Sequence, residues 1–269
     1  MLPTYFISHG GGPWPWLGGP FRSHFVQLEA SLRDLAREAG RPKAVLVISG
    51  HWETSRFTVQ SGVQPGMVYD YIGFPPDTYE IRYGAPGAPD VAARVRTLLE
   101  KAGLPAGLDA ERGYDHGTFA PLYAMYPQAD VPVLQLSLLR GYEPEAHLAA
   151  GRALAPLRDE GVLIVGSGLS WHNLRVFGAA AAAPSDAFDT WLASTLAAAP
   201  AERTARLCDW TSAPHARLAH PQEDHFVPLM VALGAAEGET AHRVYHERNF
   251  MGGVTASSYR FGELATTNP

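Results

Sequence analysis

Short runs rich in branched apolar residues alternate along the chain with longer amphipathic segments, and this alternation restricts the possible folds more than any other feature of the sequence. The short runs have the length and composition of buried β-strands, and they occupy residues 4–8, 43–49, 56–60, 131–137 and 161–166. Strands that alternate with helices form layered α/β folds, because each helix covers a face of the sheet. We therefore predict an α/β fold with a central mixed β-sheet flanked by helices.

The longer segments have the periodicity of helices. Apolar residues recur every three or four positions in three of them before a glycine stop signal, and two more segments have a capping residue or an apolar face. The predicted helices lie near residues 25–39, 91–102, 147–160, 185–199 and 224–234. No internal repeat of fixed period and no long linker interrupts the pattern. We therefore expect one domain over residues 1–269.

Two segments lack any regular period. Residues 10–20 contain three consecutive glycines followed by proline and tryptophan, directly after a predicted strand, so we expect a non-helical turn with room for a ligand beside its backbone. Residues 65–89 carry Gly and Pro together with four tyrosines and Phe74. This aromatic content favours a long ordered loop, and such loops usually serve function.

Composition and charge exclude several classes of partner. The chain has 21 Lys and Arg against 27 Asp and Glu, a formal net charge of -6, so no general positive field would hold a nucleic acid. No apolar run approaches the ~18 residues of a membrane span, and no basic segment precedes the first apolar run. The single cysteine cannot form an intrachain disulfide. We expect a cytoplasmic protein with neither nucleic-acid nor membrane partners.

The chain has 11 histidines and one cysteine, so any bound metal would have nitrogen and oxygen ligands. His9, His51 and His172 each follow the carboxyl end of a predicted buried strand, which is where open α/β sheets bind ligands. Three imidazoles brought together there predict a metal site at the carboxyl ends of the strands. His225, at the start of a predicted helix, and His116 are further candidates. Hydrogen-bonded structural histidines are the alternative at each position.

The other six histidines lack such a context, and we expect most of them at the surface: His24, His147, His215, His220, His242 and His246. A nucleophile elbow is only loosely matched at Gly166-Ser167-Gly168, which lacks the required spacing, so a serine hydrolase is a weak alternative.

Seven motifs occur in order between residue 4 and about residue 261. They are Ser-His-Gly-Gly-Gly-Pro (8–13), Ser-Gly-His-Trp-Glu (49–53), Tyr-Asp-Tyr-Ile-Gly-Phe-Pro (69–75), Tyr-Gly-Ala-Pro-Gly (83–87), Tyr-Asp-His-Gly-Thr-Phe (114–119), Ser-Gly-Leu-Ser-Trp-His-Asn-Leu-Arg (167–175) and Glu-Asp-His-Phe-Val-Pro-Leu (223–229). Together they resemble the 4,5-DOPA extradiol dioxygenase-like proteins. These are class III extradiol ring-cleavage dioxygenases, related to the catalytic subunit of protocatechuate 4,5-dioxygenase.

The resemblance implies one α/β domain that binds a non-haem Fe(II), although members of this subgroup are also described as zinc-binding. It implies that His9, His51 and His225 are metal ligands. His172 would lie close to the metal, either as a further ligand or as the acid/base, and His116 would assist proton transfer or orient the substrate. The protocatechuate enzymes use a glutamate as third ligand, whereas the matching region here offers His225 beside Glu223 and Asp224.

The function expected from this resemblance is opening of a catechol ring with O2. Fe(2+) is expected for turnover, and Zn(2+) is the alternative metal, which is redox-inert. The loop that contains Tyr69 and Phe74 would form the wall of the substrate pocket, and Arg82 and Arg175 are candidate partners for an anionic substituent. The alternatives are a zinc-dependent hydrolase or cyclase and a non-catalytic metal-binding protein on the same scaffold. We expect a monomer or a homodimer.

Overall fold

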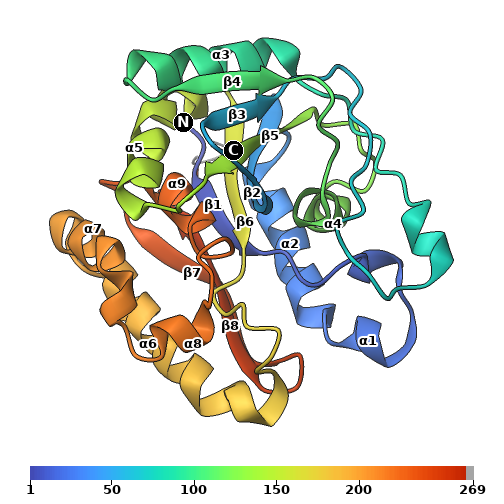
Figure 1. Cartoon of the computed structure of the whole chain (residues 1–269), viewed down its shortest axis with the longest axis vertical. Helices are drawn as coiled ribbons and strands as arrows, with labels where there is room; N and C mark the ends of the chain where they lie inside the picture. Colours follow the sequence, from blue (N-terminus) through green and yellow to red (C-terminus); the bar gives the residue numbers. More distant parts are fainter. Residues whose placement is uncertain (265–269) are drawn as a thin grey trace, which may run out of the picture.

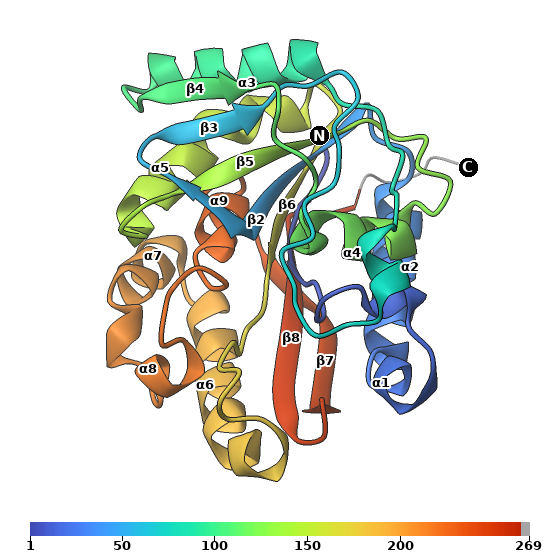
Figure 2. The ribbon, with the colours of Figure 1, turned by 45° about the vertical axis from the view of Figure 1, so that its right-hand side comes forward.

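One mixed β-sheet forms the centre of the computed structural model, which describes residues 1–264. Its strands lie in the order β4-β3-β5-β2-β6-β1-β8-β7 (Figure 1). Their bounds are β1 (Thr4–Ser8), β2 (Ala44–Thr54), β3 (Phe57–Gln60), β4 (Ala106–Asp109), β5 (Val133–Leu139), β6 (Val162–Gly168), β7 (Ala241–Phe250) and β8 (Val254–Phe261). Helices cover both faces of this sheet, which confirms the predicted α/β architecture (Figure 2).

The four central strands β5, β2, β6 and β1 are parallel and buried on both faces. Alternate residues of β2 point to opposite sides: Val45 and Val47 join one apolar core, and Leu46 and Ile48 join the other. Helices α2 (Val26–Ala39) and α4 (His116–Met125) pack on the first side. Burial on both faces explains why these strands are almost continuously apolar in the sequence.

The second side of the central strands is covered by three further helices, α3 (Pro89–Lys101), α5 (Pro144–Leu154) and α9 (Pro228–Gly234). Helix α6 (Ala182–Leu196) packs against β8 at the other end of the sheet. The remaining helices are short: α1 (Gly19–Ser23), α7 (Pro200–Cys208) and α8 (Ala216–Ala219). None of the helices within residues 1–264 is both long and apolar enough to cross a membrane.

Several elements were not predicted from the sequence. In the antiparallel hairpin β7–β8, β7 contains many polar and charged residues because it lies at the edge of the sheet and is half exposed, whereas the polar residues of β8 are almost all buried. The other edge strand, β4, has only four residues. Helix α4 contains Gly117 and Pro121, which are poor helix formers, and it persists because nearly all its residues are buried. In α4, tertiary packing therefore outweighs the low helix propensity of these two residues.

Three predicted boundaries change the position of candidate site residues. Strand β2 continues to Thr54 after an irregularity in its pairing between Ile48 and Glu53, so His51 lies within this strand and not beyond its end. Helix α9 begins at Pro228, so His225 lies in the turn before it. The segment 10–20 contains one turn of 3-10 helix, Trp14–Trp16, where a non-helical turn was expected.

Two histidines that were expected at the surface are fully buried. His147 uses both ring nitrogens: Nε2 accepts a hydrogen bond from the Leu139 backbone at 3.0 Å, and Nδ1 lies 2.8 Å from the Glu143 carbonyl oxygen. The Nε2 of His220 lies 3.1 Å from the Ser170 carbonyl oxygen. Burial lowers the pKa of His147 to about 4 and that of His220 to about 3. Both histidines are therefore neutral structural groups.

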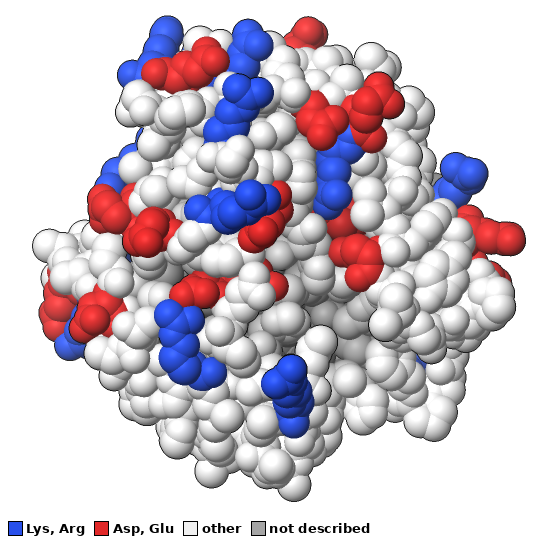
Figure 3. All heavy atoms as spheres, viewed as in Figure 1, with Lys and Arg blue, Asp and Glu red and all other residues white. Residues whose placement is uncertain are grey.

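Charged side chains are mixed on the surface. On the face shown in Figure 3, basic side chains stand among acidic ones. Such a distribution agrees with the negative net charge and offers no extended basic surface on this face.

Candidate metal centre

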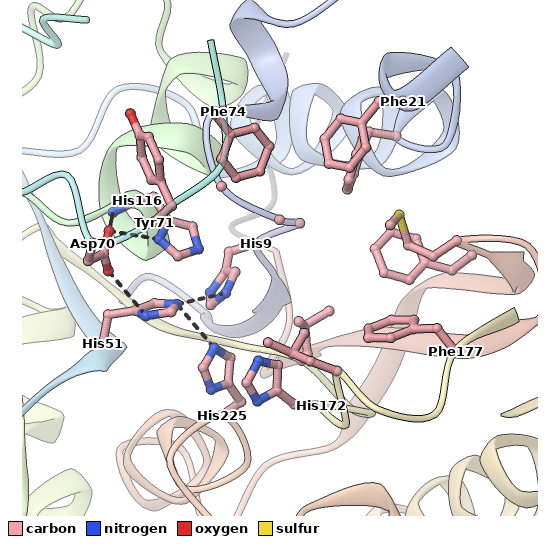
Figure 4. A pocket seen from close by; sticks show the side chains of 18 of the residues that line it. His9, Phe21, His51, Asp70, Tyr71, Phe74, His116, His172, Phe177 and His225 are labelled. Carbon is pink, nitrogen blue, oxygen red and sulfur yellow. Dashed lines mark hydrogen bonds and ion pairs between the residues drawn. The ribbon is translucent and has the colours of Figure 1, made fainter. Parts of the chain in front are cut away.

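Three imidazoles from distant parts of the chain meet at one end of the sheet (Figure 4). His9 directly follows β1, His51 lies in the irregular end of β2, and His225 lies in the turn before α9. The His51 Nε2 is 3.3 Å from the His9 Nε2 and 3.0 Å from the His225 Nε2. All three ligand nitrogens lie within 4.8 Å of one another, a spacing that could hold one metal ion.

Two glycines let the His225 turn approach the sheet closely. A Cβ atom on Gly168 would lie 2.0 Å from the His225 carbonyl oxygen, and one on Gly50 would lie 2.9 Å from the Asp224 carbonyl oxygen. The backbone N–H of Leu169 then donates to the His225 carbonyl at 3.1 Å. Glycine is therefore required at both positions for His225 to come close to His9 and His51.

The hydrogen-bond partners of two rings assign their tautomers. Ser167 donates its hydroxyl proton to the Gly117 carbonyl, so its Oγ accepts from His9 Nδ1 at 3.0 Å. The His51 Nδ1 lies 3.1 Å from Asp70 Oδ2, which favours a proton on that nitrogen. Each Nε2 is then unprotonated and directed at the other ring.

Two unprotonated nitrogens 3.3 Å apart cannot hydrogen-bond to each other, and their lone pairs repel. A cation between the two nitrogens would accept both lone pairs. In metal-bound histidines the second ring nitrogen donates to a neighbouring group, as the Nδ1 atoms of His9 and His51 do to Ser167 and Asp70. The His225 Nδ1 is buried 3.1 Å from Asp224 Oδ2 without forming a hydrogen bond. The donor set therefore fits a metal bound by three neutral imidazoles.

Burial keeps these imidazoles uncharged. Burial and the neighbouring His116 lower the pKa of His51 to about 3, against the opposing effect of Asp70. Burial and the surrounding imidazoles also lower the pKa of His9 and of His225 well below the ordinary value. A histidine must be deprotonated to bind a metal, so all three are ready to do so at neutral pH.

Asp70 joins His51 to a fourth imidazole, that of His116. The Asp70 Oδ1 accepts from the His116 Nδ1 at 2.8 Å and from the His116 backbone N–H at 3.1 Å, while Oδ2 faces His51. Burial raises the pKa of Asp70, but the hydrogen bonds from His116 and the electrostatic effect of the two neighbouring imidazoles outweigh it and lower this pKa to about 2. The ionised carboxylate thereby orients both rings. Asp70 lies in the motif Tyr-Asp-Tyr-Ile-Gly-Phe-Pro (69–75), but no sequence pattern indicated its role.

His172 lies beside the nitrogen cluster. Its ring stacks on that of His225, with centroids 3.3 Å apart and planes inclined by 12°. The ring nitrogens of His172 make no hydrogen bond to residues 1–264, and Nδ1 is 3.9 Å from Asp224 Oδ1. Glu223 is paired with Arg217 at 2.7 Å. His172 and Asp224 are not part of the group formed by His9, His51 and His225, but together with His225 they form a second group whose potential ligand atoms lie within 4.8 Å of one another.

A buried polar network holds the end of β2 beneath the site. Asp115 is fully buried; its Oδ1 accepts from Ser49 Oγ at 2.7 Å, and its Oδ2 accepts from Gln135 at 2.6 Å and from Arg112 at 2.8 Å. Arg112 also donates to the His51 carbonyl at 3.3 Å. The members of this network come from separate segments of the chain and share no sequence pattern, so the network could not be predicted.

The histidines line one end of a cavity of about 590 Å³. His116, His172, Tyr71, Phe74 and the glycines 10–12 also line it, as expected for the Gly-rich turn and the aromatic loop. Tyr69 does not line the cavity, contrary to the position expected from the sequence. Its hydroxyl instead donates to the Ile81 carbonyl at 2.8 Å and holds the loop together.

Gly117 provides a test of the packing around the ligands. Its Cβ atom, if present, would lie 2.6 Å from Ser49 Oγ, 2.9 Å from His51 Cδ2 and 3.3 Å from His9 Nδ1. Alanine is the better helix former by about 1 kcal/mol, yet we expect Gly117→Ala to weaken metal binding by about 10- to 100-fold because both ligands must move. Competition with a metal chelator measures this change.

The matched control is Gly238→Ala, since no atom lies within 4 Å of a Cβ atom built at that position. It should leave metal affinity unchanged. Equal affinity in the two variants would contradict the close packing of Gly117 against the ligands.

Known proteins are similar to this chain over nearly its whole length. The model of the family described as catalytic LigB subunit of aromatic ring-opening dioxygenase matches residues 4–262. A 4,5-DOPA dioxygenase extradiol of Beta vulgaris is 42% identical over 263 residues, covering 96% of the chain and 96% of that relative. A protein of Hapsidospora irregularis called dioxygenase tasH is 37% identical over 286 residues, covering 97% of the chain and 86% of the relative.

A solved structure has the same architecture. The crystal structure of uncharacterized protein JW3007 from Escherichia coli K12 matches with a TM-score of 0.80 and 30% sequence identity. The match covers 97% of the chain and 100% of that structure.

Proposed function

Because the chain belongs to the family of catalytic LigB subunits of aromatic ring-opening dioxygenases, we propose that it is a metal-dependent extradiol dioxygenase that opens the ring of a catechol with O2. The observation that carries the proposal is the convergence of three Nε2 atoms, together with the Nδ1 atoms of His9 and His51, which face the Ser167 hydroxyl and the Asp70 carboxylate. This arrangement fits a metal ion better than a set of hydrogen-bonded structural histidines.

His9, His51 and His225 are the proposed ligands. A bound Fe(II) would supply adjacent open positions for the two catechol oxygens and O2, together with the electrons that activate O2. Three neutral ligands leave the charge of the ion uncompensated, which favours an anionic catecholate. The same nitrogen atoms also suit Zn(II), which cannot donate an electron.

His172 is the proposed proton acceptor for the substrate hydroxyl. It lines the cavity, and its ring nitrogens form no hydrogen bond with the described residues, so they are free to bind substrate. Burial, with smaller effects of His51 and His116, lowers the pKa of His172 to about 3, so the ring is neutral at neutral pH. Such a ring is a weak base by itself, and it would take the proton of a hydroxyl that a bound metal has made more acidic. The ring nitrogen that takes this proton can later return it to the product.

His116 is the proposed second proton carrier, or the residue that orients the substrate. Asp70 accepts from its Nδ1, so the Nε2 of neutral His116 carries the lone pair. Tyr71 and Phe74, from the aromatic loop, would pack on the substrate ring.

Metal reconstitution tests the proposal. Metal-free protein is loaded anaerobically with Fe(II) or with Zn(II) and then given O2 and a panel of catechols, while oxygen uptake and the yellow absorbance of a ring-opened semialdehyde are recorded. We expect oxygen uptake and yellow product with Fe(II) and neither with Zn(II). Absence of both signals with every catechol would contradict the proposal. Hydrolytic activity of the Zn(II) form alone would favour the zinc-dependent hydrolase.

A further inference from the structure

The end of the cavity away from the imidazoles is lined by apolar side chains. Figure 4 shows Phe21 and Phe177 at this end, opposite His9 and His51, with Phe74 on one side. These side chains and their neighbours form the apolar chamber: Phe21, Phe74, Leu174, Phe177, Phe250 and Met251.

Charged groups lie only at the histidine end. No Lys or Arg among residues 1–264 lines the cavity, and the candidate anion partners Arg82 and Arg175 are not part of its wall. Two carboxylates line it, and both lie at the histidine end: Asp70 interacts with His51 and His116, and Asp224 accepts a hydrogen bond from the backbone N–H of His225. A charged substituent in the apolar chamber would therefore lose its hydration without gaining a partner.

The size and the mouth of the cavity also favour an apolar group. Its volume of about 590 Å³ is in the range that holds drug-sized ligands, which exceeds the need of a bare catechol. Ile72 and Leu174 line it and are 90% and 74% exposed, so the mouth of the cavity is apolar as well. A substrate with an apolar extension would cover part of their surface.

We propose, on the premise that the chain is an extradiol dioxygenase, that its substrate is a catechol with an uncharged apolar substituent, either alkyl or aryl. The two hydroxyls would face the histidines, and the substituent would occupy the apolar chamber. Catechols with a carboxylate or an amino-acid side chain are poor substrates, because this chamber offers no counter-charge.

Two measurements on the same preparations test this inference. The first compares kcat/KM of the Fe(II)-loaded protein for 4-phenylcatechol, 4-tert-butylcatechol, 3,4-dihydroxybenzoate and 3,4-dihydroxyphenylalanine. The second measures binding of these compounds to Zn(II)-loaded protein by calorimetry, without turnover. We expect the two apolar catechols to exceed the two charged ones by at least about 100-fold in kcat/KM. Their dissociation constants should follow the same order.

A matched pair of variants, each with one added positive charge, tests the same inference. Leu174→Arg adds a cation to the cavity wall at an exposed position, and it should raise kcat/KM for 3,4-dihydroxybenzoate relative to 4-phenylcatechol by about 10-fold. Val63→Arg adds the same charge at a position that is 72% exposed and outside the cavity wall, and it should leave the ratio unchanged.

The outcomes separate the two proposals. Equal or better cleavage of the charged catechols overturns the apolar substrate class and leaves the dioxygenase proposal intact. Preferential binding of the apolar catechols without any cleavage overturns the dioxygenase activity and supports the apolar chamber as a binding site. If none of the catechols binds or is cleaved, both proposals fail.

Discussion

Replacing His51 with alanine is expected to weaken metal binding by more than about 100-fold. Loss of a residue that only orients a metal ligand weakens metal binding by about 10- to 100-fold, and loss of the ligand itself should weaken it more. The His51 Nε2 is the nitrogen that lies close to both others, 3.3 Å from that of His9 and 3.0 Å from that of His225. Its removal would leave two of the three donors and would also remove a partner of Asp70. Metal content after dialysis and chelator competition measure the effect, with circular dichroism as a check on folding.

A buried histidine outside the cluster provides the control. The His220 ring packs among Phe188, Trp210 and Phe226, so His220→Phe keeps an aromatic ring in an aromatic environment. This variant should retain its metal. Full metal content in folded His51→Ala protein would show that the converging nitrogens are not the metal site.

Replacing His172 with alanine is expected to lower kcat by about 10²- to 10⁴-fold with nearly unchanged metal content, the usual effect of removing a general acid or base. The physical reason is its position: the ring stacks on His225 and lines the cavity without an atom in the His9, His51 and His225 group. Oxygen uptake of Fe(II)-loaded variant and native protein, normalised to bound iron, measures the loss.

The same measurements on His116→Ala distinguish the two candidate proton carriers. If His172 is the principal acceptor, His116→Ala should lose less activity and should mainly raise KM, since the orientation of the substrate suffers. A loss of metal in proportion to activity in His172→Ala would instead identify His172 as a fourth ligand. A larger loss in His116→Ala would transfer the acceptor role to His116.

Local patterns in the sequence were sufficient for the central part of the fold. The parallel strands β1, β2, β5 and β6 are buried on both faces, so each appears as an apolar run that is recognisable without knowledge of its neighbours. The position of His9 at the end of such a run, and of His51 and His172 near the ends of two others, was enough to predict that these side chains meet at one edge of the sheet.

The hairpin β7–β8 and helix α4 could not be predicted in this way. In the hairpin, β7 lies at the sheet edge and is half exposed, while β8 is buried although it contains several polar residues. Helix α4 contains Pro121 and also Gly117, where the neighbouring histidines leave no space for a larger side chain. Their stability comes from contacts with residues far away in the chain, and a local window of sequence contains no information about those contacts.

By itself, the sequence determined the α/β class, the number of candidate imidazoles and the edge of the sheet at which they gather. The resemblance to a family already named His9, His51 and His225 and placed His172 near them, but only the tertiary structure decided that their Nε2 atoms converge, that Asp70 orients two rings and that the far end of the cavity is apolar. The reason is one of scale: strand ends can be located to within a few residues from periodicity, whereas coordination depends on nitrogen positions a few ångströms apart. Those positions are set by close backbone contacts at Gly50 and Gly168 and by hydrogen bonds between distant segments.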